Sequence, residues 1–146
     1  MNKPKKVFDS SEELQEYVDY WVEKLFLTDW IIKAELVPTS RIEGSYGKNI
    51  NNWMLKTSHI QISVYDNDMR EILIKSKNVR KFCQEQTLIH ELLHSKYCIS
   101  MGKIDKYELL LMELTEHAKL EQLAKSLLMT KYDLTFDWFK DEWEED

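Results

Sequence analysis

One segment of this 146-residue chain constrains its fold more than any other: the apolar run around His90 and His94. Residues 87–95 read Thr-Leu-Ile-His-Glu-Leu-Leu-His-Ser, and histidines aside, Glu91 is their one charged side chain. A helix of this sequence is apolar around most of its circumference, which is typical of a buried helix. The fold must therefore enclose it and also provide partners for its histidines and its glutamate, because burying unpartnered polar groups is costly.

The spacing of the two histidines indicates a metal site. Residues four apart in a helix lie one above the other, so His90 and His94 present two imidazoles to one point, as tetrahedral zinc requires. Glu91 follows His90 directly, where its carboxylate can take a proton from a metal-activated water. The pattern predicts Zn²⁺ bound by His90 and His94, with Glu91 as the general base of a hydrolase. The alternative is a helix whose histidines are simply hydrogen-bonded core or surface residues.

A second long helix, expected over about 105–129, supplies the candidates for the third ligand. One continuous face, with steps of four and three, contains Leu110, Leu114, His117, Glu121, Ala124 and Leu128. His117 interrupts this apolar seam and is the preferred third ligand. Glu116 and Glu113, on the adjacent stripe, are the alternatives. Glu121, four residues after His117, can hydrogen-bond a neighbouring ligand and orient it.

The remaining patterns predict a single α+β domain. Further elements are expected at 10–27 (capped amphipathic helix), 30–37 (strand), 41–52 (hairpin or weak strand), 59–65 (alternating strand) and 78–100 (helix with the histidine pair, stopped by Gly102). The order of helix, strands and two helices indicates packed layers with a mainly antiparallel sheet.

Composition favours a single globular domain in the cytoplasm. The chain is 43% hydrophobic and 32% charged, and its length suits about one domain. No run approaches the ~18 apolar residues of a membrane span, and no apolar signal core follows the charged N-terminus. These observations lead us to expect no membrane partner. Cys83 and Cys98 are too few for a disulfide scaffold and too far apart in one helix to bridge, so we expect both to be free thiols.

Charge argues against nucleic acid as a partner. The net charge of −6 opposes binding to phosphates. The basic stretch 75–81 is a partial exception, which we interpret as a solvated loop and first helical turn. The tail 132–146 carries large aromatic residues among acidic ones. We favour packing of this tail on the body over binding of a partner, because exposed clusters of large aromatics are uncommon.

Residues 87–94 resemble the HExxH motif of the zincin metallopeptidases, in particular the small single-domain zincin-like proteins of phages and bacteria. The downstream run 116–128, Glu-His-Ala-Lys-Leu-Glu-Gln-Leu-Ala-Lys-Ser-Leu-Leu, is similar to their second ligand-bearing helix, and also to repressor-cleaving peptidases of the ImmA/IrrE type. Those relatives carry an acidic third ligand where this chain has His117. The resemblance implies a zincin-like fold, a Zn²⁺ cofactor, and a protein or peptide substrate held in extended form along an edge strand, here residues 59–65.

Three functions are compatible with these patterns. The intact Glu91 between the two ligands favours a zinc-dependent peptidase. The short chain motivates a zinc-stabilised binding or regulatory domain without significant turnover. The basic stretch 75–81 is the one support for a DNA-associated protease, as in the SprT-like families, and the net charge opposes it. Four residues are unranked candidates for stabilising a transition state: Tyr46, His59, Tyr97 and Tyr107.

Overall fold

The computed structural model describes residues 3–75, 81–97 and 106–140, with the backbone alone for 106–114 and 140. Its elements are α1 (Ser11–Lys24), β1 (Ile31–Val37), the 3-10 helix η1 (Thr39–Ile42), β2 (Gly47–Asn52), β3 (Thr57–Ser63), α2 (Asn67–Lys75), α3 (Gln84–Lys96), α4 (Lys106–Tyr132) and α5 (Asp137–Lys140). The α+β class is confirmed. No helix within these residues is both long and apolar enough to cross a membrane.

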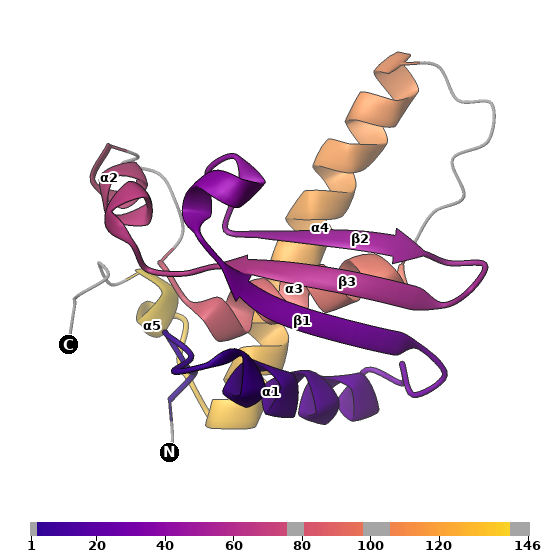
Figure 1. Cartoon of the computed structure of the whole chain (residues 1–146), viewed down its shortest axis with the longest axis horizontal. Helices are drawn as coiled ribbons and strands as arrows, with labels where there is room; N and C mark the ends of the chain where they lie inside the picture. Colours follow the sequence, from indigo (N-terminus) through magenta and orange to yellow (C-terminus); the bar gives the residue numbers. More distant parts are fainter. Residues whose placement is uncertain (1–2, 76–80, 98–105, 141–146) are drawn as a thin grey trace.

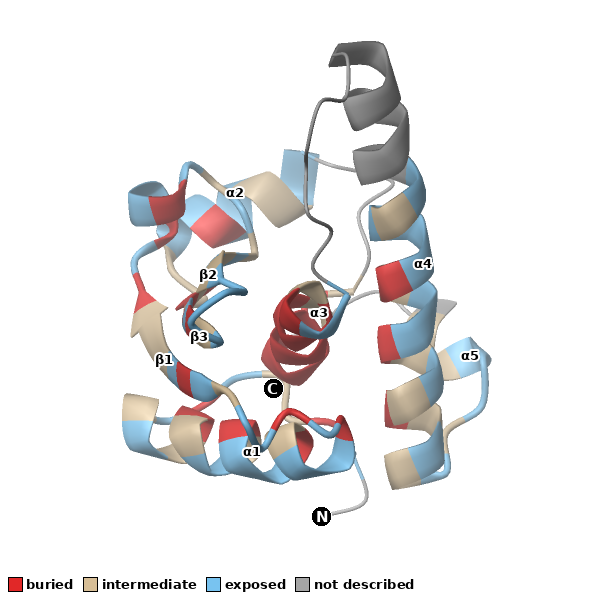
Figure 2. Ribbon diagram, turned by 90° about the vertical axis from the view of Figure 1, so that its right-hand side faces the viewer, coloured by how far each residue is buried: buried red, intermediate tan, exposed pale blue. Residues whose placement is uncertain are grey.

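Helix α3 lies at the centre of the fold, between the sheet and α4 (Figure 2). Its apolar residues Leu88, Ile89, Leu92 and Leu93 are all at most 2% exposed, as the apolar run predicts. The helix predicted over 78–100 is present as Gln84–Lys96, and the described residues 81–83 before it are not helical, so its predicted start is wrong. Cys98 and Gly102 lie outside the described residues, whereas Cys83 is a buried thiol that is in no disulfide and donates to the carbonyl of Lys5 at 3.6 Å.

The three strands form a mixed sheet in the order β1-β3-β2 (Figure 1). β3 runs parallel to β1 and antiparallel to β2. The prediction of a mainly antiparallel sheet is therefore wrong, because the β2–β3 hairpin places β3 beside β1 in the same direction. The prediction that 59–65 forms the edge strand is also wrong. β3 buries Ile60 and Ile62 and lies in the middle, whereas the polar strand β2 lies at an edge.

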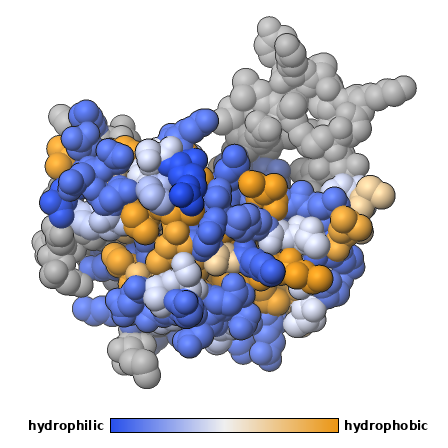
Figure 3. Space-filling view, in the orientation of Figure 1, coloured by the Kyte–Doolittle hydropathy of each residue, from blue (hydrophilic) through white to orange (hydrophobic). Residues whose placement is uncertain are grey.

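The outer face of the sheet carries a mixture of apolar and hydrophilic residues (Figure 3). Ile31 is 65% exposed and Ile50 is 53% exposed. They line an open hollow of about 360 Å³ together with Lys33, Thr57, Ser58 and His59. The Nε2 of His59 lies 3.2 Å from the carboxylate of Glu35 on this face. His59 thus lies on the face of β3 opposite to Ser58, which contacts α3.

Helix α2 was not predicted from the sequence. Asp66 precedes it and accepts a hydrogen bond from Met69 N at 2.9 Å, as an N-cap residue does. The same carboxylate accepts hydrogen bonds from the backbone and hydroxyl of Thr39, at 2.9 and 2.6 Å. Burial raises the pKa of Asp66, but the hydrogen bonds from Thr39 and Met69 outweigh it and leave the pKa below its usual value. Asp66 therefore fixes α2 to the end of β1.

A buried carboxylate, Glu85, joins three helices. Its side chain is fully buried and accepts hydrogen bonds from Trp21 Nε1 on α1 (3.0 Å) and from Lys131 Nζ (2.8 Å) and Tyr132 Oη (2.6 Å) on α4. The backbone N–H of Lys5 donates a fourth at 2.9 Å. Burial and the bond to Glu85 raise the pKa of Tyr132 far above its usual value, so it stays a donor. Glu85 thereby fixes the C-terminal half of α4 against α1 and α3.

The cation that pairs with Glu85 is enclosed by aromatic rings. The Lys131 ammonium lies 4.1 Å from the ring centroid of Tyr20, 4.7 Å from that of Tyr132 and 4.9 Å from that of Tyr17. Such cation–π contacts gain strength where the cation is partly removed from water. The rings and the carboxylate therefore hold the end of α4 against α1 and α3.

The described part of the tail also contacts the body. Leu134 and Phe139 pack against the core, and Lys81 Nζ donates to the carbonyl of Trp138 at 3.2 Å. Phe136 remains 62% exposed. Trp143 lies outside the described residues.

Replacing Glu85 by alanine should lower the free energy of unfolding by about 3 kcal/mol, because it leaves a buried cation and buried donors without their acceptor. Urea denaturation measures this loss. The matched control is Glu16→Ala on the exposed side of α1, which should change stability by less than about 0.5 kcal/mol. Equal losses in the two variants would contradict the anchoring role of Glu85.

Candidate metal centre

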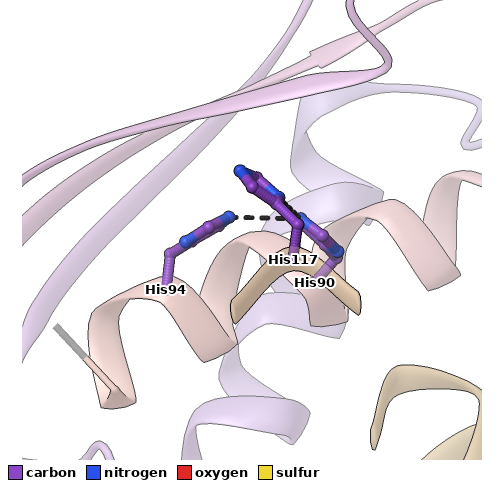
Figure 4. Close-up of side chains that lie close together, drawn as sticks. All are labelled: His90, His94 and His117. Atoms are coloured by element: carbon purple, nitrogen blue, oxygen red, sulfur yellow. Dashed lines mark hydrogen bonds between the residues drawn. The ribbon is translucent and has the colours of Figure 1, made fainter. Parts of the chain in front are cut away.

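Three histidine side chains converge between α3 and α4 (Figure 4). His90 and His94 come from α3 and His117 comes from α4. The Nε2 atom of His90 lies 3.1 Å from Nε2 of His94 and 3.2 Å from Nδ1 of His117. All three nitrogens lie within 4.8 Å of one another, as the ligands of one metal ion would. The expected juxtaposition of these three residues is thus present in the structure.

The donor set could hold a metal ion. Zinc–nitrogen bonds of about 2.0–2.1 Å in a tetrahedral shell would separate the nitrogens by roughly 3.3 Å, close to the two distances from Nε2 of His90, and the third pair lies within 4.8 Å. Burial, together with the neighbouring His90 and His117, lowers the pKa of His94 to about 4. His94 is therefore neutral at pH 7, which is the form of histidine that binds metals.

The second nitrogen of His90 faces a carboxylate from α4. Its Nδ1 lies 2.9 Å from Oε2 of Glu121, a close contact although its angle is not that of a well-formed hydrogen bond. The other oxygen of Glu121 accepts a hydrogen bond of 2.6 Å from Nε2 of Gln86. Glu121 is thus in the position of a carboxylate that orients a metal-binding histidine.

The acidic alternatives for the third ligand differ from His117 in position. Glu116 is not among the residues whose ligand atoms converge, although its side chain is described. The side chain of Glu113 lies outside the described residues. Among the described residues, the geometry therefore favours three histidines over a mixed set with Glu116.

Strand β2 holds the backbone of the histidine-bearing helix in place. The amide Nδ2 of Asn49 donates to the carbonyl of Glu91 at 2.6 Å and to Oγ of Ser95 at 2.8 Å. The Ser95 hydroxyl also lies 2.5 Å from the hydroxyl of Ser58 on β3. The Glu91 side chain lies just under this strand and is 7% exposed. The backbone of Glu91, between the two histidines, is therefore positioned by contacts with the sheet as well as by its own helix.

An open pocket of about 320 Å³ adjoins the histidines. It is lined by Ser45, Tyr46, Gly47, Thr87, His90, Glu91, His117 and Glu121. Of the four candidates for stabilising a transition state, Tyr46 lines this pocket, whereas Tyr97 does not and is 47% exposed. His59 lies on the outer face of the sheet, and the side chain of Tyr107 is outside the described residues.

Gly47 permits the close approach of β2 to α3, a role that the sequence pattern over 41–52 did not predict. A Cβ atom at this position would lie 2.6 Å from Cγ2 of Thr87 and 3.1 Å from Cγ of Glu91. The first distance is far below a van der Waals contact, so a side chain would require strand or helix to move. A glycine inside a polar strand is the signal that could have found it, because such glycines mark close contacts.

Comparisons of the chain with protein-family models, with curated proteins and with solved structures found no match. The assignment of a function therefore rests on the site itself. What the structure supplies is an α+β fold in which three histidines could hold one metal ion beside a buried glutamate.

Replacing Gly47 by alanine should force β2 away from α3 and lower the free energy of unfolding by about 1–3 kcal/mol, as overpacking does. Urea denaturation measures the loss, and the NMR amide shift of Glu91 reports the displaced helix. The control is Lys48→Ala, at the next, exposed position of β2, which should change neither the free energy of unfolding nor the amide shift of Glu91. An alanine variant with unchanged stability and an unchanged Glu91 shift would contradict the close approach.

Proposed function

We propose that the protein is a zinc-dependent metallopeptidase in which His90, His94 and His117 bind the metal and Glu91 is the general base. The observation that carries the proposal is the convergence of three ligand nitrogens next to a 7%-exposed glutamate in an open pocket. When bound, zinc supplies Lewis-acid chemistry, since it acidifies water and polarises a carbonyl group. A site with these parts suits hydrolysis better than electron transfer, because zinc has no redox chemistry.

Glu91 would take a proton from the attacking water and later deliver it to the leaving amine. Its place between the two α3 ligands keeps it beside the metal position without making it a ligand. Asn49 fixes the backbone of Glu91 through the 2.6 Å hydrogen bond to its carbonyl. Both Glu91 and Tyr46 line the pocket, so we propose Tyr46 as the residue that donates to the developing oxyanion.

An extended peptide is the substrate that best suits the surroundings of this pocket. β2 pairs with β3 on one side, and no other described strand pairs with its second side. An extended chain can add to such an edge through backbone hydrogen bonds. Because Gly47 begins β2 and also lines the pocket, a peptide lying along β2 would pass the metal position. This arrangement supports a peptide substrate.

The alternative function is a zinc-stabilised binding or regulatory domain without significant turnover. This function is favoured because the three histidines come from two helices, so a metal ion bound by His90, His94 and His117 would join α3 to α4. A structural metal makes the same connection without chemistry. The two functions agree on the ligands and differ on Glu91, which makes Glu91 the residue to test.

We expect protein purified without chelators to contain one zinc ion per chain. His117→Ala should weaken zinc binding by more than about 100-fold, since a ligand matters more than an outer-shell partner. Zinc titration by calorimetry and the rise in Tm on adding zinc measure the effect. The control is His59→Ala, which removes the fourth histidine of the chain from the outer face of the sheet. Metal-free wild type, or equal affinities in the two variants, would refute the proposed ligands.

Glu91→Gln should keep the bound zinc but lower peptide cleavage by about 10²–10⁴-fold, because the amide cannot accept the proton. Mass spectrometry of a mixed peptide library measures cleavage by wild type and variant. Glu116→Gln is the matched control on α4 and should keep both zinc and cleavage. If zinc-loaded wild type cleaves nothing, the binding domain is the better assignment. Equal cleavage by wild type and Glu91→Gln excludes Glu91 as the base.

A further inference from the structure

We propose that Gln86 is a positioning residue, whose buried amide holds the Glu121 carboxylate against Nδ1 of His90. Gln86 precedes His90 by one helical turn on α3, so both side chains lie on one face of that helix. Glu121 reaches both from α4: its Oε1 accepts from Gln86 Nε2 at 2.6 Å, and its Oε2 lies 2.9 Å from His90 Nδ1. The inference deepens the proposed function, on which its consequence for zinc rests.

The surroundings of Gln86 indicate that its N–H group is the part that matters. The side chain is completely buried, and its Oε1 has no hydrogen-bond partner among the described residues. A buried unpartnered carbonyl is unfavourable, and an apolar side chain of the same size would avoid it. Gln84, two residues earlier and equally buried, is different: its Oε1 accepts from Phe8 N and its Nε2 donates to the carbonyl of Ser63. Gln84 thus uses both ends of its amide to hydrogen-bond the backbone of other segments, whereas the described side-chain hydrogen bond of Gln86 is the one to Glu121.

An amide suits this task better than a cation. A lysine or arginine at position 86 would pair with the carboxylate and offset its charge, whereas the Gln86 amide fixes one oxygen and leaves the charge in place. The second oxygen thereby lies 2.9 Å from His90 Nδ1. A proton held at Nδ1 leaves Nε2 with the lone pair that a metal ion needs, and Nε2 is the atom that faces His94 and His117. Gln86 would thus select the tautomer of the first ligand without touching the metal.

The test compares Gln86→Met with Gln84→Met, two variants that remove a buried amide from the same helix. Both should lose stability in urea. NMR of the imidazole nitrogens in metal-free protein should show His90 protonated at Nδ1 in wild type and in Gln84→Met, and a mixture of tautomers in Gln86→Met. Zinc affinity should fall about 10-fold in Gln86→Met, at the lower end for outer-shell partners, and stay unchanged in Gln84→Met. In a Glu121→Ala background, Gln86→Met should have no further effect on zinc affinity.

The proposal is overturned if Gln86→Met keeps the wild-type tautomer and zinc affinity, if Gln84→Met weakens zinc equally, or if the effects of Gln86→Met and Glu121→Ala on affinity add. Should Gln86→Met fail to fold, wild type alone decides: the Gln86 side-chain amide protons must be protected from solvent exchange and show a contact to Glu121. A wild type that binds no zinc would refute the metallopeptidase. The metal-free tautomer measurement would still decide the role of Gln86.

Discussion

The burial of α3 is the constraint on which the rest of the structure depends. Its first three residues are all polar and at most 1% exposed, so each requires partners inside the protein. Gln84 binds the segment before α1 and the end of β3. Glu85 binds α1 and the end of α4, and Gln86 binds the middle of α4. Consecutive helix residues point in directions about 100° apart, so three neighbours can contact three different layers.

The same arrangement explains why the histidines lie where they do. One and two turns further along α3, His90 and His94 face His117 of α4, while Glu91 faces β2. Helix α4 is fixed to α3 at two levels, by Lys131 and Tyr132 at its end and by Glu121 near its middle. The proposed third ligand, His117, lies one turn before Glu121. The packing that satisfies the buried polar residues of α3 thus also brings the third imidazole to the other two.

The sequence predicted the features that depend on one helix or one helix pair. The positions of His90, Glu91 and His94 follow from helical spacing, and the interruption of an apolar seam by His117 and Glu121 indicated which face of α4 meets them. The sheet order was not predictable, because the pairing of β1 with β3 joins residues that are distant in sequence. Helix α2 was missed, although Asp66, directly after the predicted strand 59–65, is its cap. The role of Gln86 depends on its three-dimensional neighbours.

The missing side chain at Gly47 has a consequence for recognising related proteins. The five-residue histidine motif is short enough to occur by chance, so it identifies few proteins with certainty. The contact between Gly47 and Thr87 ties a position on the edge strand to one just before the motif. A residue larger than glycine at position 47 requires one smaller than threonine at position 87 if the gap between strand and helix is kept. Paired substitutions at these two positions would distinguish chains that share this packing from chains that merely repeat the motif.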